Sequence, residues 1–72
     1  MDEVVIKTKF IKLQQLLKLA GVISQGSDVK LYIKENKIMV NDVLTTERGK
    51  KIYHGDIVIV KDIGKFKVIE KQ

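Results

Sequence analysis

The predicted fold is organised around the segment Gly21-Val22-Ile23-Ser24-Gln25-Gly26-Ser27-Asp28-Val29-Lys30. Gly21 follows an apolar helical repeat and is a typical helix stop. Ser24 or Ser27 can cap a following helix, and Asp28 suits the positive end of that helix dipole. The stretch therefore predicts two helices joined by a tight Gly/Ser-rich elbow.

Upstream of the elbow, the sequence predicts a strand and then an amphipathic helix. The β-branched run Val4-Val5-Ile6 predicts the strand. Thr8 is the expected N-cap of a helix from Lys9 to Ala20. Apolar residues recur at helical spacing on one side of this helix. That side is expected to pack in the core and consists of Phe10, Leu13, Leu16, Leu17 and Ala20.

Downstream of the elbow, the second helix is expected to run to about Glu35, with Asn36 as a left-handed C-cap. Asn41-Asp42 lies between two apolar runs and predicts a β-hairpin. The remaining segments are predicted to be a polar loop at 45–51, a turn at His54-Gly55-Asp56, a strand at 57–60, a reversal at 62–65 and a strand at 66–69.

Length and composition set limits on the fold and on its chemistry. At 72 residues we expect one domain over residues 1–72 with a small core, because short chains bury a smaller fraction of their surface. With no cysteine and only one histidine, His54, we expect no metal and no cofactor. The order of elements predicts an α+β fold, with two packed helices against a small, mostly antiparallel β-sheet.

The charge balance points to an anionic partner. The chain carries 14 Lys and Arg against 9 Asp and Glu, a formal net charge of +5. This excess favours nucleic acid or an anionic membrane surface, although a solvated lysine-rich surface would show the same composition. The apolar runs are too short to cross a bilayer, and the acidic start Met1-Asp2-Glu3 is unlike a signal peptide. We expect a cytoplasmic protein that does not bind membranes.

The basic residues are predicted to gather on one surface. Lys12 and Lys18 fall on the outer side of the first helix, and Lys30 and Lys34 on the outer side of the second. A basic loop, Arg48-Gly49-Lys50-Lys51, follows the hairpin. Lysine supplies point charges for phosphates, and arginine adds a planar fork for bidentate pairing. The elbow glycine Gly26 would let the backbone approach a phosphate closely.

Several short motifs occur together in a recognisable order. They are Lys12-Leu13-Gln14, Leu17-Lys18-Leu19-Ala20-Gly21, Gln25-Gly26, Val40-Asn41-Asp42 and Gly55-Asp56. Residues 12–58, about two-thirds of the chain, thereby resemble the RNA-binding domain named after small-subunit ribosomal protein S-four, the alpha-L motif. The run from Thr46 to Lys51 resembles the small stand-alone members of this family, of the YaaA or YbcJ type.

The resemblance implies a non-catalytic protein that binds structured RNA, with a role in ribosome assembly or quality control. Ribosomal RNA is the expected target and transfer RNA the other candidate, with a ribosomal subunit as a further partner. We expect a monomer. The residues that the resemblance and the charge pattern assign to RNA binding are Lys12, Gln15, Lys18, Gln25, Gly26, Ser27, Lys30, Lys34, Asn41, Arg48, Lys50 and Lys51.

Two other readings compete with RNA binding. The chain can be a protein-interaction module in which the strand at 57–60 or at 66–69 pairs with a partner at a sheet edge. An enzyme is the least favoured reading, because no nucleophile or carboxylate pair stands at a recognisable spacing from His54. Tyr53 and Tyr32 are weaker candidates for stacking on bases, and Tyr32 is expected to face the core.

Overall fold

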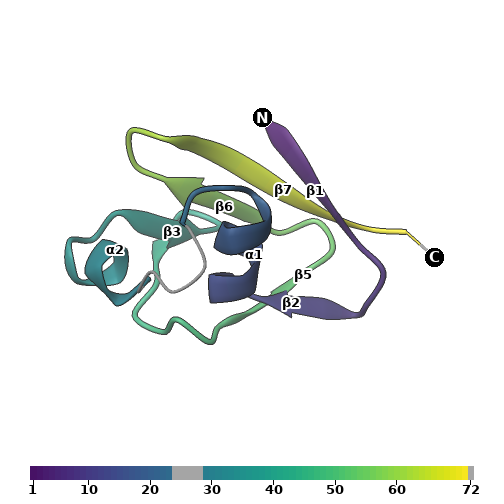
Figure 1. Cartoon of the computed structure of the whole chain (residues 1–72), viewed down its shortest axis with the longest axis horizontal. Helices are drawn as coiled ribbons and strands as arrows, with labels where there is room; N and C mark the ends of the chain where they lie inside the picture. The colour runs from purple at the N-terminus through teal and green to yellow at the C-terminus, as the bar shows by residue number, and fades with distance from the viewer. Residues whose placement is uncertain (24–28, 72) are drawn as a thin grey trace.

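The computed structural model describes residues 1–23 and 29–71. Figure 1 shows two short helices beside a twisted sheet, with the first and last strands next to each other. The helices are α1 (Leu13–Leu19) and α2 (Lys30–Lys34). The strands are β1 (Asp2–Ile6), β2 (Phe10–Lys12), β3 (Ile38–Val40), β4 (Val43–Leu44), β5 (Lys51–Tyr53), β6 (Ile57–Val60) and β7 (Gly64–Glu70).

The strands form a five-stranded sheet in the order β1-β7-β6-β3-β4 and a two-stranded sheet of β2 and β5. Every pair is antiparallel except β1 with β7, so the predicted α+β fold with a mostly antiparallel sheet is confirmed. Both β6 and β7 have a strand on each side. The prediction that residues 57–60 or 66–69 offer a sheet edge to a partner is therefore wrong.

The first helix is shorter than predicted. It begins at Leu13 rather than Lys9, because residues 10–12 form β2 and pair with β5. Thr8 is not its N-cap; the hydroxyl donates a hydrogen bond to the carbonyl oxygen of Phe10, at 2.8 Å. The apolar spacing continues smoothly from Phe10 into α1. Residue periodicity alone therefore did not show where the strand ends and the helix begins.

Both helices end in the same way, as predicted. Gly21 has φ +79°, and the N–H of Val22 reaches back to the carbonyl oxygen of Leu17 at 2.9 Å. Asn36 has φ +57°, and the N–H of Lys37 makes the equivalent bond to Tyr32, also at 2.9 Å. A left-handed residue followed by this long backward bond is a Schellman cap, which satisfies the last carbonyls of a helix. The second helix begins at Lys30, directly after Val29, and its predicted caps Ser24, Ser27 and Asp28 lie outside the described residues.

The predicted hairpin at Asn41-Asp42 is present between β3 and β4. Val40 and Val43 pair directly across the turn. Asn41 has φ +51° and Asp42 has φ +67°. Positive φ at both central positions is the signature of a type I′ turn, whose twist matches that of the two strands. Asparagine and aspartate adopt this conformation at lower cost than other non-glycine residues.

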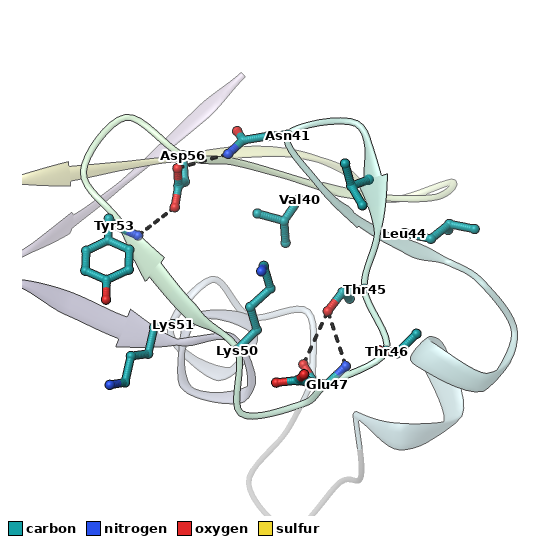
Figure 2. A pocket seen from close by; sticks show the side chains of 11 residues that line it. Val40, Asn41, Leu44, Thr45, Thr46, Glu47, Lys50, Lys51, Tyr53 and Asp56 are labelled. Atoms are coloured by element: carbon teal, nitrogen blue, oxygen red, sulfur yellow. Dashed lines mark hydrogen bonds between the residues drawn. The ribbon is translucent and has the colours of Figure 1, made fainter.

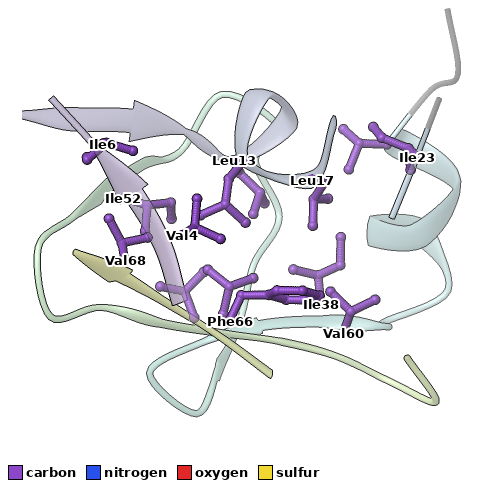
Figure 3. Close-up of a cluster of buried hydrophobic side chains, with 14 residues drawn as sticks. Val4, Ile6, Leu13, Leu17, Ile23, Ile38, Ile52, Val60, Phe66 and Val68 are labelled. Atoms are coloured by element: carbon purple, nitrogen blue, oxygen red, sulfur yellow. The ribbon is translucent and has the colours of Figure 1, made fainter. Parts of the chain in front are cut away.

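The hydrophobic core lies between the helices and the five-stranded sheet (Figure 3). Leu13, Leu16 and Leu17 of α1 are fully buried, and Tyr32 and Ile33 of α2 pack against the same cluster. Within the described part of the chain the cluster comprises Val4, Ile6, Leu13, Leu16, Leu17, Ile23, Val29, Ile38, Val40, Ile52, Val58, Val60, Phe66 and Val68. Because β5 contributes Ile52, the small sheet is anchored in this core as well.

A pair of leucines on α1 tests this description of the core. Leu16 is 0% exposed and Leu19 is 62% exposed. We expect Leu16→Ala to lower the free energy of unfolding by about 2–5 kcal/mol, because it removes buried methyl groups and leaves a cavity. Leu19→Ala should change it by no more than about 0.5 kcal/mol. Urea unfolding followed by circular dichroism measures both, and equal losses would contradict the burial of this face of α1.

Candidate nucleic-acid interface

The basic loop is joined to the start of α1 by the backbone. The N–H of Leu13 donates to the carbonyl oxygen of Lys50 at 2.8 Å, and the N–H of Gln14 donates to that of Arg48 at 3.1 Å. The first N–H groups of a helix have no acceptor within the helix itself. Here the loop supplies two of the missing acceptors, so its backbone is held against the N-terminus of α1.

Strand pairing continues this connection. In the sheet of β2 and β5, Lys12 lies directly opposite Lys51. Lys12 is also the residue that precedes the first turn of α1. The structure therefore brings Lys12, predicted to lie in the first helix but found at the end of β2, next to Lys50 and Lys51 of the loop. These segments are almost forty positions apart in the sequence.

Thr45 shapes the start of the loop and was not predicted to matter. It is only 6% exposed, and its N–H bonds to the carbonyl oxygen of Ile38 at 3.1 Å. Its hydroxyl oxygen accepts a hydrogen bond from the N–H of Glu47 at 3.3 Å (Figure 2). A turn follows, in which the N–H of Lys50 donates to the carbonyl oxygen of Glu47, also at 3.3 Å. A threonine two residues before a turn is a recognised turn former. That local signal was available in the sequence.

The predicted helical contacts are all exposed where the structure describes them. Lys12, Gln15 and Lys18 are three residues apart from one another, and all three side chains face solvent. Lys30 and Lys34, at the two ends of α2, are exposed as well. The predicted elbow contacts Gln25, Gly26 and Ser27 lie outside the described residues.

Most of these lysines keep their charge available. Lys37 pairs with Glu35 at 3.6 Å, and both side chains are well exposed. In the part of the chain that the structure describes, Lys12, Lys18, Lys34, Lys50 and Lys51 make no ion pair with a carboxylate. Positive groups that the protein does not neutralise are suited to phosphates.

Asn41 has a structural task that the sequence did not reveal. Its side-chain N–H₂ donates to Asp56 at 3.0 Å, and its side-chain oxygen accepts the N–H of Ile57 at 2.9 Å. The second carboxylate oxygen of Asp56 accepts the N–H of Tyr53 at 2.8 Å. The two turns, at 41–42 and at 54–56, are thereby tied together. A contact of Asn41 with RNA stays a prediction, since its amide already has partners at both ends.

A groove runs between the β3–β4 hairpin and the segment 45–53, with a volume of about 430 Å³. One wall of the groove is apolar and is formed by Val40, Val43 and Leu44. Figure 2 shows the side chain of Lys50 extending into the groove toward Val40. Polar lining comes from Thr45, Thr46, Glu47 and Asp56, among others. The groove therefore adjoins the basic loop and combines an apolar wall with a cation.

In residues 1–23 and 29–71, no three His, Cys, Asp or Glu side chains gather in a way that would hold a metal ion. No helix in the same residues is long and apolar enough to cross a membrane.

Known proteins resemble this chain over most of its length. The family model described as the S4 domain matches residues 4–69, and the chain belongs to this family. It is also similar to the probable ribosome maturation protein RlbA of Bacillus subtilis (strain 168), with 42% identity over 64 residues. That match covers 89% of this chain and 90% of the relative. The resemblance inferred from the short motifs is thus confirmed.

The role of Asn41 can be separated from the strain of its turn. Asn41→Ala and Asp42→Ala both place alanine at positive φ, but only Asn41 has side-chain hydrogen bonds to another turn. We expect Asn41→Ala to lower the free energy of unfolding by about 1–3 kcal/mol more than Asp42→Ala, because two hydrogen bonds are lost. Urea unfolding of the two variants gives the difference. No difference would show that the link to Asp56 and Ile57 contributes nothing to stability.

Proposed function

We propose that this chain binds structured RNA through one basic surface and catalyses no reaction. The basic surface consists of Lys12, Lys18, Lys30, Lys34, Arg48, Lys50 and Lys51. Gln15 and the elbow residues Gln25, Gly26 and Ser27 are proposed as further contacts. The observation that carries the proposal is the attachment of the loop to α1 through Leu13 and Gln14. It holds cations from two distant segments together in a fixed arrangement.

The proposed target is ribosomal RNA, with transfer RNA as the other candidate. Membership of the S4 domain family supports RNA binding, and similarity to a probable ribosome maturation protein supports a role in ribosome biogenesis. We place this role in the cytoplasm, on a ribosomal subunit or its precursor, with the protein acting as a monomer. The α1–elbow–α2 segment would be the alpha-L motif of the family.

The composition of the basic surface indicates how it would read RNA. Lysine dominates it, and an ammonium group is a point charge without the planar fork of arginine. Double-stranded RNA is recognised mostly by its shape, its phosphates and its 2′-hydroxyl groups. A lysine-rich surface therefore suits a folded RNA whose phosphates stand in a particular arrangement better than a particular base sequence.

Salt dependence tests the electrostatic part of the proposal. The logarithm of the RNA affinity should fall linearly with the logarithm of salt concentration, by roughly 0.7–0.9 for each phosphate contacted. A titration of a structured ribosomal RNA fragment at several salt concentrations gives the slope. A slope near zero would contradict binding through this surface.

Charge reversal tests where the surface lies. Lys12→Glu with Lys50→Glu removes one cation from the start of α1 and one from the loop, both exposed. We expect a large loss of RNA affinity and a salt slope reduced by about 1 for each lysine that contacts a phosphate. The fold should persist, because glutamate is favourable near a helix N-terminus and opposite Lys51.

The matched control is Lys61→Glu with Lys65→Glu. These two lysines are exposed at the turn between β6 and β7, away from β2 and β5 in Figure 1, and the net charge changes equally. This control should lose much less affinity than the first pair. Equal losses, with folding verified by circular dichroism, would mean that diffuse charge drives binding and that no localised surface exists.

A further inference from the structure

The two faces of the small sheet of β2 and β5 carry different side chains. Ile11 lies opposite Ile52, and this pair faces inward, with Ile52 fully buried and Ile11 packed against the core. Successive residues of a strand point to opposite faces. The outer face therefore carries two cross-strand pairs, Phe10 with Tyr53 and Lys12 with Lys51.

The lysine pair is unfavourable for the protein by itself. Like charges directly opposite each other in a sheet are destabilising. In the described part of the chain neither Lys12 nor Lys51 has a carboxylate partner that would relieve the repulsion. A local rule that is broken with no carboxylate to offset it is typical of a functional site. An anion bound between the two ammonium groups would supply the compensation.

The aromatic pair stands in the next row of the same face. The ring centroids of Phe10 and Tyr53 are 5.8 Å apart with the planes tilted by 49°. The ammonium group of Lys51 lies 4.9 Å from the centroid of the Phe10 ring. Tyr53 remains 49% exposed, and the bond from its N–H to Asp56 fixes its backbone. Phe10 thus contacts both Tyr53 and Lys51, and the Tyr53 ring is the one that is exposed to a ligand.

We propose that the outer face of β2 and β5 binds an unpaired nucleotide, with the base stacked on Tyr53 and a neighbouring phosphate held between Lys12 and Lys51. The two rows are two residues apart along each strand, or about 7 Å. Long lysine side chains can bridge from there to the phosphates next to a stacked base. The geometry combines a stacking ring with cations, as in other single-strand binding sites.

This site rests on the proposed function and refines it. The basic surface would hold a folded RNA, and the outer face of β2 and β5 would hold a single-stranded segment that leaves it. Because Lys12 and Lys51 belong to both, the two parts are continuous. The preferred ligand is then an RNA in which a helix adjoins unpaired nucleotides, rather than an uninterrupted duplex.

The test compares two RNA probes. One is a stem-loop with an unpaired tail that contains 2-aminopurine, whose fluorescence falls on stacking, and the other is the same stem-loop without a tail. The proteins are the wild type, Tyr53→Thr, Tyr53→Phe and Ile63→Ala. Threonine keeps a high strand propensity and removes the ring, and phenylalanine keeps the ring. Ile63 is a similarly exposed apolar residue outside the site.

We expect Tyr53→Thr to weaken binding of the tailed probe by roughly 5- to 150-fold, the usual effect of losing one stacked base, and to leave the tailless probe unchanged. Tyr53→Phe and Ile63→Ala should bind both probes like the wild type. The 2-aminopurine signal should be quenched by the wild type and by Tyr53→Phe, and not by Tyr53→Thr.

The outcomes separate this site from the proposed function. If the wild type binds both probes equally and without quenching, the stacking site is wrong and RNA binding stands. An equal loss on both probes for Tyr53→Thr also overturns stacking. Binding of neither probe by the wild type would overturn the proposed function and this site together.

Discussion

The N–H groups of Leu13 and Gln14 bond to the carbonyl oxygens of Lys50 and Arg48, and the placement of the basic loop beside Lys12 and the start of α1 depends on these two hydrogen bonds. A helix start without acceptors is costly, so the loop and the helix stabilise each other. The same contact extends the ladder between β2 and β5. The elements that present the cations are therefore fixed by backbone chemistry, which leaves the side chains exposed and available to a ligand.

Local chemistry explains which parts of the fold could be predicted. Gly21 and Asn36 end their helices, and Asn41-Asp42 forms its turn, because each conformation depends on residues within a few positions. The boundary at Leu13 could not be predicted in this way. Residues 10–12 become a strand only because residues 51–53 pair with them, and no pattern within a short window records a partner so far away.

The same distinction applies to the candidate site. Exposure of Gln15, Lys18, Lys30 and Lys34 follows from helical periodicity and was predictable. Lys12 is exposed as predicted, but as a residue of β2 and not of the helix. The task of Asn41 was not, because its partners Asp56 and Ile57 lie in a different turn. Nor was the row of Phe10 and Tyr53, since Phe10 matched a helical core position equally well. Apart from Thr45, whose signal was local, what sequence reasoning missed depends on non-local pairing: Tyr53 was named as a stacking candidate, but its pairing with Phe10 was not.

The parallel pairing of β1 with β7 has a consequence for how the chain folds as it is made. Asp2 pairs with Phe66 and Ile6 with Glu70, so β1 leaves a translating ribosome well before the strand with which it pairs. β7 lies between β1 and β6, so it joins β1 to the rest of the sheet. Contacts between such distant residues form slowly. Until then β1 has no partner, and Val5 and its neighbours present an open edge to other nascent chains.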